Sequence, residues 1–270
     1  MIKTFINAAL AAGADIMEIY ATDFNVEDKE DGSPVTLADQ RAEAIIVKIL
    51  GQECPQLPVV GEESVAAGRI PQIGSRFAIV DPIDGTKEFI KRNGEFTVNI
   101  GLVEDGEVVA GVVFAPALGD LYWGTLEDGA FKARVENGHL TDERPIRCRA
   151  AGEGSLTVVA SRSHRTERTE AFLEKLPDVS VISAGSSLKF CRVAEGEADL
   201  YPRFGRTMEW DTAAGQAVLR AAGGRTFVEG GDPLRYNKQG TTPEERFENP
   251  FFLAVGDEQI ISRFRLKSGW

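Results

Sequence analysis

The chain has 270 residues, 43% of them hydrophobic and 27% charged, which is the composition of a soluble globular protein with one large domain or two small ones. Its 42 acidic and 30 basic residues give a net charge of −12. This charge argues against nonspecific binding to nucleic acid, because nucleic-acid phosphates need a basic surface. It is compatible with a phosphate ligand only where bound cations reverse the local field.

The few cysteine and histidine residues exclude several kinds of site. The three cysteines lie far apart without CxxC spacing, so neither a disulfide framework nor a thiolate metal site is expected. The two histidines, His139 and His164, exclude a His-rich zinc site. No apolar run approaches the roughly 20 residues of a membrane span, and Asp15 and Glu18 interrupt the N-terminal apolar segment, which indicates a helix rather than a signal peptide. We expect a cytoplasmic protein, with peripheral association at the inner membrane face left open.

The predicted elements change character along the chain. Helices are expected at residues 2–20 and 36–50, the second beginning at Thr36 as its N-cap. Strands are expected at residues 57–61, 77–81, 96–103, 108–114 and 121–124, with a hairpin turn in EDGEVV, residues 104–109. Residues 1–150 are therefore predicted to form an N-terminal α+β half.

After a polar link near residues 144–154, strands and helices alternate. The expected strands are 155–161, 179–183, 198–202 and 251–255, and the expected helices are 167–175, 186–195, 211–222 and 257–264. This alternation is typical of an α/β unit, so residues 151–270 are predicted to form a C-terminal α/β half. The polar segment 229–249 is predicted to be a long loop, interpreted as a lid or rim.

Acidic residues stand at the ends of these elements rather than on helix faces. They are Asp39, Glu62, Asp81, Asp84 and Asp211. The ends of strands and the starts of helices are where α/β proteins build their sites. Mg²⁺ prefers carboxylate and carbonyl oxygens and keeps some waters. The sequence DPIDGT, in which two acids and the Ile83 carbonyl follow a buried strand, therefore favours a cation site.

Each acidic residue also has a purely structural interpretation. Asp211 alone can be a helix N-cap, and Asp84 in DGT can belong to an ordinary turn. Glu62 alone can be part of a solvated pair of acids, and Asp39 alone can be a favourable charge at a helix dipole. The order of the motifs along the chain, rather than any one residue, favours a functional site.

The motifs GEES (61–64), DPIDGT (81–86) and WDTAAG (210–215), in this order, resemble the inositol monophosphatase superfamily over almost the whole chain. The resemblance implies a layered αβαβα sandwich, α+β or α/β in class, and a Mg²⁺-dependent, lithium-sensitive phosphatase. It implies two or three Mg²⁺ ions. Their ligands would be Glu62, Asp81, the Ile83 carbonyl, Asp84 and Asp211. The catalytic residues Asp39 and Thr86 would position the attacking water.

These roles suit phosphate hydrolysis, which needs a nucleophile, charge neutralisation and a stabilised leaving oxygen. Paired divalent ions about 4 Å apart provide all three, and they make a histidine base unnecessary. Thr86 is not itself a strong base, but its hydroxyl can orient a water if Asp39 accepts its hydrogen bond. The N-terminal half would then carry the strands of the metal site, and the C-terminal half the substrate-binding residues.

Four longer stretches resemble the CysQ-type 3'(2'),5'-bisphosphate nucleotidase branch more than the inositol enzymes. They are residues 84–102, 161–164, 185–205 and 209–219. This resemblance implies a small-molecule nucleotide partner, adenosine 3',5'-bisphosphate, cut to AMP and phosphate in the recycling of a sulfur-assimilation by-product. It implies no nucleic-acid partner, and a monomer or homodimer. The implied substrate-binding residues are Gly85, Thr86, His164, Ser186, Lys189, Arg203 and Asp211.

A second phosphate needs fixed positive charges, and the sequence offers two. Lys189 lies in the helix that Ser186 opens, and free amides at a helix start favour anions. Arg203 follows the strand ADLYP and can bind a phosphate through two hydrogen bonds. In the inositol enzymes a Glu before the WD motif contacts sugar hydroxyls, whereas this neighbourhood carries Arg203 and Arg206 and no acid at the matching place. The structural alternatives are an exposed helix charge for Lys189, a surface position or an ion pair with Glu209 for Arg203, and a helix cap for His164.

Three departures from the CysQ type bear on the substrate. GEES is closer to the inositol enzymes, Arg206 replaces a usual Pro, and the stretch 235–250 is unusually polar. An inositol monophosphatase or a sugar bisphosphate phosphatase therefore remains an alternative. A nucleotide-binding sensor without catalysis is the alternative outside the enzymes, although the presence of every expected metal ligand and of Thr86 argues against it.

Overall fold

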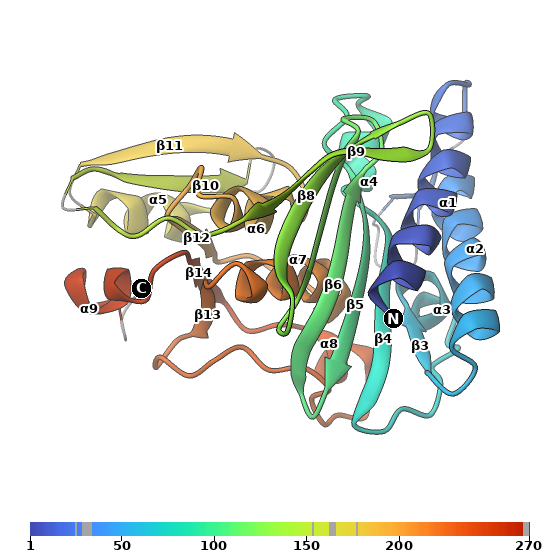
Figure 1. Ribbon diagram of the computed structural model, residues 1–270. Coiled ribbons are helices and arrows are strands. Elements are labelled where there is room, and N and C mark those ends of the chain that lie inside the picture. The colour runs from blue at the N-terminus through green and yellow to red at the C-terminus, as the bar shows by residue number, and fades with distance from the viewer. Residues whose placement is uncertain (25, 29–33, 153, 162–165, 177, 267–269) are drawn as a thin grey trace.

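The computed structural model describes residues 1–270 except 25, 29–33, 153, 162–165, 177 and 267–269. Two mixed β-sheets alternate with three helical layers (Figure 1). The first outer layer consists of α1 (Ile2–Tyr20) and α2 (Leu37–Glu53), and the central layer consists of α6 (Leu188–Ala194) and α7 (Glu209–Ala221). The second outer layer consists of α5 (Glu167–Glu174) and α9 (Gln259–Arg263). This order confirms the predicted layered αβαβα sandwich.

A seven-stranded sheet lies between the first two helical layers. Its strands, in both spatial and chain order, are β3 (Val59–Gly61), β4 (Arg76–Asp84), β5 (Thr97–Glu104), β6 (Glu107–Ala115), β7 (Asp120–Thr125), β8 (Gly129–Glu136) and β9 (His139–Ile146). β3 and β4 are parallel, and the remaining pairs are antiparallel. The predicted hairpin at residues 104–109 is confirmed: Asp105 and Gly106 both have positive φ, 50° and 77°, as a tight two-residue turn requires.

A five-stranded sheet lies between the second and third helical layers. Its spatial order is β11 (Val179–Ala184), β10 (Leu156–Ser161), β12 (Leu200–Arg203), β14 (Phe252–Val255) and β13 (Arg225–Val228). Alternate residues of β14 face opposite layers, as strand geometry dictates. Phe252 and Ala254 join the core shared with α6 and α7, whereas Leu253 and Val255 join the core shared with α5 and α9.

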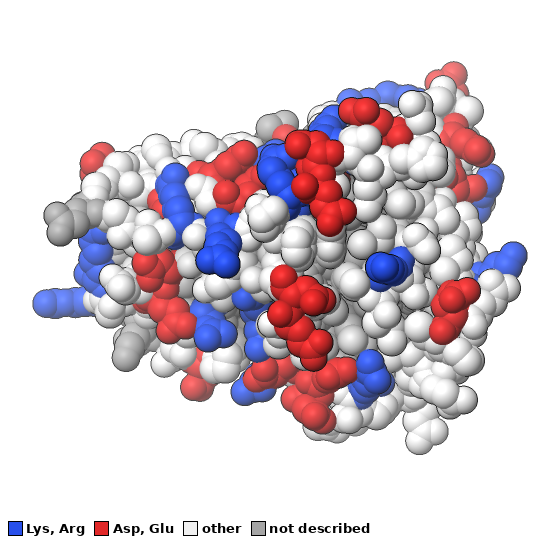
Figure 2. Space-filling model, viewed as in Figure 1, with Lys and Arg blue, Asp and Glu red and all other residues white. Residues whose placement is uncertain are grey.

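Several short or polar elements differ from the predicted ones. The helices α3 (Glu62–Ala66) and α4 (Thr86–Ile90) follow the GEES and DPID motifs, and β1 (Val26–Asp28) pairs with β2 (Pro34–Thr36). The segment 229–249 is not wholly loop, because it contains α8 (Pro243–Phe247). None of the helices formed by the described residues has the length and apolar composition needed to cross a bilayer. On the face shown in Figure 2, the described basic side chains are scattered among acidic ones.

Glycines on the seven-stranded sheet determine how closely α7 approaches it. A Cβ added to Gly101 on β5 would lie 2.9 Å from the Cβ of Ala213, and one added to Gly111 on β6 would lie 2.7 Å from the carbonyl of Ala214. Ordinary side chains at these positions would push the helix away, since packed interiors hold no spare volume. The small residues on both surfaces therefore place the first turn of α7, with Asp211, against the ends of β4 and β5.

Candidate active site

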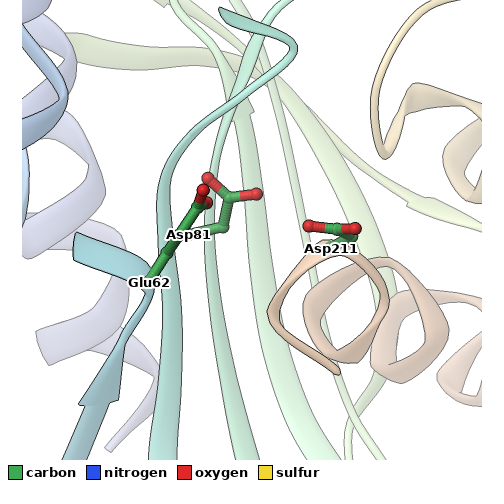
Figure 3. Close-up of side chains that lie close together, drawn as sticks. All are labelled: Glu62, Asp81 and Asp211. Atoms are coloured by element: carbon green, nitrogen blue, oxygen red, sulfur yellow. The ribbon is translucent and has the colours of Figure 1, made fainter. Parts of the chain in front are cut away.

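Three carboxylates from distant parts of the chain meet between the seven-stranded sheet and α7 (Figure 3). Glu62 is the first residue of α3, Asp81 lies on β4, and Asp211 lies in the first turn of α7. One oxygen from each lies within 4.8 Å of the others. Figure 3 shows the carboxylates of Glu62 and Asp81 side by side, with Asp211 facing them. The fold therefore brings residues almost 150 positions apart in the sequence within reach of one ion.

An irregularity in β4 brings Asp84 to the same region. Asp81 pairs with Asn99 and Asp84 pairs with Thr97, so three steps along β4 match two along β5. Residues three apart in a regular strand point to opposite faces. The extra residue of a bulge returns Asp84 to the side of Asp81. Asp84 accordingly lines one pocket with Glu62 and Asp211.

Crowding and burial of these carboxylates disfavour their charged forms. Burial, and then the charges of Asp84 and Glu62, raise the pKa of Asp211 to about 8. Burial also raises the pKa of Asp84, while the Lys189 ammonium and the hydrogen bond from Ser187 act in the opposite direction. Such a group of crowded, partly buried carboxylates is stabilised when protons or cations balance its charge.

The donor set fits a hard divalent cation. The three clustered groups are all carboxylates, with neither histidine nor cysteine among them. Oxygen-only ligands suit Mg²⁺ or Ca²⁺, whereas zinc and copper favour nitrogen and sulfur. The arrangement is therefore suited to Mg²⁺, and a bound cation would also relieve the repulsion that raises the pKa of Asp211.

Thr86 and Asp39 meet beside this cluster. Thr86 begins α4 directly after Gly85, whose φ is 93°. Its hydroxyl is 3.2 Å from Asp39 Oδ1 and 3.3 Å from the carbonyl oxygen of Ile83. The other oxygen of Asp39 accepts the Thr36 N–H at 2.8 Å and its hydroxyl at 2.7 Å. Asp39 therefore both closes the first turn of α2 and directs the Thr86 hydroxyl.

Two cations enter the same pocket from the five-stranded sheet side. Lys189 is buried, its ammonium donates to the Ser186 carbonyl at 2.7 Å, and burial lowers its pKa to about 8. Arg203 donates through one terminal nitrogen to the Arg206 carbonyl at 2.9 Å. Its Nε is buried and has no hydrogen-bond partner among the described residues. Buried donors are normally satisfied, so a bound anion is the natural acceptor for this group.

The remaining expected substrate residues differ in their surroundings. Ser186, with φ of 47°, places its hydroxyl 2.7 Å from the carbonyls of both Asp84 and Glu95. Its only proton is therefore engaged within the protein, and α6 begins two residues later, at Leu188. Gly85 allows this approach, because a Cβ there would lie 2.1 Å from the Ser186 hydroxyl. His164 falls outside the described residues.

Ser187 is a site residue that sequence reasoning assigned no separate role. Its hydroxyl lies 2.9 Å from Asp84 Oδ2 and 2.8 Å from the Asp211 carbonyl, and it accepts a hydrogen bond from Asn99 at 2.9 Å. One side chain thus joins β4, β5 and α7 beneath the carboxylates. A serine at the start of a helix gives no sequence signal of contacts this distant in the chain.

The five layers and the carboxylate centre define a class of layered α/β proteins with a cluster of acidic residues, able to bind a metal ion, between the larger sheet and the central helices. The model of the inositol monophosphatase family matches residues 1–252, and the chain belongs to this family.

The chain is also similar to named proteins and to solved structures. The 3'(2'),5'-bisphosphate nucleotidase CysQ of Salmonella typhimurium LT2 is 44% identical over 257 residues, covering 93% of this chain and 98% of the relative. The protein of that name from Escherichia coli K12 is 43% identical over 257 residues, with the same coverage. Among solved structures, CysQ from Bacteroides thetaiotaomicron superposes with a TM-score of 0.78 at 40% identity, covering 95% and 97% of the two chains. Inositol monophosphatase from Anabaena gives a TM-score of 0.74 at 24% identity over 99% and 96%, which shows the shared fold alone.

Proposed function

We propose that the protein is a 3'(2'),5'-bisphosphate nucleotidase, which hydrolyses the 3'-phosphate of adenosine 3',5'-bisphosphate to give AMP and phosphate. The observation that carries this proposal is one pocket lined both by the carboxylates Glu62, Asp84 and Asp211 and by the cations Lys189 and Arg203. Relatives that carry this enzyme name are 43% to 44% identical over almost the whole chain. The proposed biological setting is the recycling of a sulfur-assimilation by-product.

The carboxylates would hold the metal. Two or three Mg²⁺ ions would bind Glu62, Asp81, Asp84, Asp211 and the carbonyl of Ile83. When bound, such ions activate a water for attack and neutralise the charge of the phosphate and of the leaving oxygen. On this proposal residues 1–150 supply every metal ligand except Asp211, and residues 151–270 supply most substrate contacts.

The chain's own part in the reaction is to orient the attacking water. The Thr86 hydroxyl donates a hydrogen bond to Asp39 at 3.2 Å. Its lone pairs can therefore accept a hydrogen bond from that water. The second oxygen of Asp39 accepts hydrogen bonds from the Thr36 N–H and hydroxyl. These contacts hold the carboxylate in the orientation in which its first oxygen accepts from Thr86. The pair therefore works by positioning, without a histidine base.

The cations would hold the phosphate that is not cut. Arg203 has a buried Nε that an anion would satisfy, and Lys189 adds a second positive charge from α6. Gly85 and Ser186 line the same pocket and would contribute backbone groups. An inositol monophosphate offers this pair of cations no second phosphate, because its only phosphate is the one that is cut.

Phosphate release from a panel of substrates tests the proposal. The panel contains adenosine 3',5'-bisphosphate, inositol 1-phosphate and fructose 1,6-bisphosphate, each with and without Mg²⁺. We expect the nucleotide to be hydrolysed with the highest kcat/KM and only in the presence of Mg²⁺. Faster turnover of inositol phosphate or of sugar bisphosphate would overturn the substrate assignment, and nucleotide binding without any phosphate release would indicate a sensor.

A further inference from the structure

Helix α2 presents a second buried carboxylate that the proposed reaction does not use. Asp39 and Glu43 lie one helical turn apart, and both are buried, with exposed fractions of 2% and 4%. Residues four apart on a helix share one face. Asp39 contacts Thr86, whereas Glu43 contacts the chain that follows β3. One face of α2 therefore reaches two different parts of the site.

Glu43 receives three hydrogen bonds from the two residues that follow Glu62. One oxygen accepts the N–H of Glu63 at 2.7 Å. The other accepts both the N–H of Ser64, at 2.8 Å, and the Ser64 hydroxyl, at 2.6 Å. The first N–H groups of any helix lack partners within that helix. The Glu43 carboxylate supplies these partners for the five-residue helix α3.

The backbone on the other side of Glu62 also packs against Glu43. A Cβ added to Gly61 would lie 2.4 Å from the carboxyl carbon of Glu43. Only glycine allows so close an approach of the chain to this carboxylate. The Glu43 side chain therefore holds Gly61 by packing and Glu63 by a hydrogen bond, with Glu62 between them.

We infer that Glu43 is a positioning residue that fixes the Glu62 carboxylate at the metal centre. A helix of five residues is not stable by its own propensity, so its orientation depends on tertiary contacts. Its first residue is the one that faces Asp81 and Asp211. Residues that orient metal ligands typically change metal affinity by about 10- to 100-fold when replaced. This inference rests on the proposed function, in which Glu62 is a metal ligand.

Two substitutions disturb this contact in different ways. Glu43→Gln keeps the size of the side chain but places an amide NH₂ where an oxygen now accepts an N–H. Gly61→Ala keeps the carboxylate but drives it out of its position. Glu53→Gln is the matched control, because Glu53 is an exposed acid on the same helix. Purified metal-free proteins would be titrated with Mn²⁺, and free Mn²⁺ would be measured by electron paramagnetic resonance.

We expect E43Q and G61A each to weaken Mn²⁺ binding by about 10-fold or more, while E53Q binds Mn²⁺ like the wild type. At saturating Mg²⁺ the KM for the nucleotide should be unchanged in E43Q. Mn²⁺ binding by E43Q equal to that of the wild type would overturn the inference, even if the variant is less stable. A wild-type protein that binds Mn²⁺ but releases no phosphate would instead refute the proposed function and leave the role of Glu43 standing.

Discussion

The hydroxyl of Ser187 lies 2.9 Å from the Oδ2 of Asp84, and this contact ties the segment leading into α6 to the end of β4. The same hydroxyl lies 2.8 Å from the carbonyl of Asp211. The two halves of the carboxylate centre, one on the seven-stranded sheet and one on α7, are thus joined by a single side chain.

Replacing Ser187 by Ala should loosen the proposed metal centre. Asp84 loses its hydrogen bond, and the buried amide of Asn99 loses its acceptor, which costs about 1–3 kcal/mol of unfolding free energy. We expect S187A to need several-fold more Mg²⁺ for half-maximal activity, measured by phosphate release against Mg²⁺ concentration. Ser262→Ala, which removes an exposed serine hydrogen bond on α9, is the control. An unchanged Mg²⁺ requirement in S187A would show that Ser187 does not support the ligands.

Asp39→Asn should affect turnover without affecting metal binding. The amide no longer fixes the Thr86 proton, so the orientation of the water is lost and kcat should fall by about 100-fold or more. Thr36→Ala is the control, because it removes one hydrogen bond to Asp39 but keeps the contact with Thr86. We expect T36A to lose about 1 kcal/mol of stability and to keep its kcat. Equal losses of kcat in D39N and T36A would indicate that Asp39 has only a capping role.

The sequence predicted the helices and strands in which apolar residues follow a clear pattern along the chain. β5 and β6 are apolar strands joined by a short polar turn, so both were predictable. β9 was missed because it is an edge strand with mostly exposed polar residues, which leaves no alternation to detect. α4 was not predicted because it is a single short helix after Gly85.

The candidate site was predictable where it follows element ends and unpredictable where it depends on contacts between distant segments. The sequence indicated that Asp81 and Asp84 form part of one site, but not the bulge that brings them to one side of β4. The contacts of the polar segment 229–249 with distant residues were likewise not predictable from the sequence. Lys238 pairs with the fully buried Glu209, and Asn249 donates to the carbonyl of Met208 at 2.7 Å. These residues brace the start of α7, which composition alone cannot reveal.

The raised pKa of Asp211 predicts how pH and Mg²⁺ act together. Its pKa is about 8 in the metal-free fold against 3.8 ordinarily. The folded state therefore holds a proton that the unfolded chain releases, and stability falls as pH rises from about 4 to about 8. Mg²⁺ would replace this proton, so Mg²⁺ should raise the Tm more at about pH 8.5 than at about pH 6. Between about pH 4 and about pH 8, Mg²⁺ binding should release protons. Equal Tm increases at both pH values would contradict this coupling.

Arg203→Met should change substrate preference rather than catalysis. Loss of a charged hydrogen-bond donor to the second phosphate costs about 1.5–3 kcal/mol, which is about a 10- to 150-fold rise in KM for adenosine 3',5'-bisphosphate. Adenosine 3'-monophosphate lacks the 5'-phosphate, so its KM should hardly change. Arg206→Met is the matched control, because Arg206 is half-exposed and pairs with Glu248. A similar rise in KM for both substrates in R203M would refute the specificity role of Arg203.

The most direct test is to locate the metal. Crystals soaked in Mn²⁺ would be measured at the Mn absorption edge, so that anomalous scattering marks each ion. We predict peaks in direct contact with the carboxylates of Glu62, Asp81, Asp84 and Asp211, and no such peaks in Asp84→Asn crystals treated identically. Mn²⁺-supported phosphate release by a protein whose crystals bind Mn²⁺ only elsewhere would contradict a catalytic metal centre built from these residues.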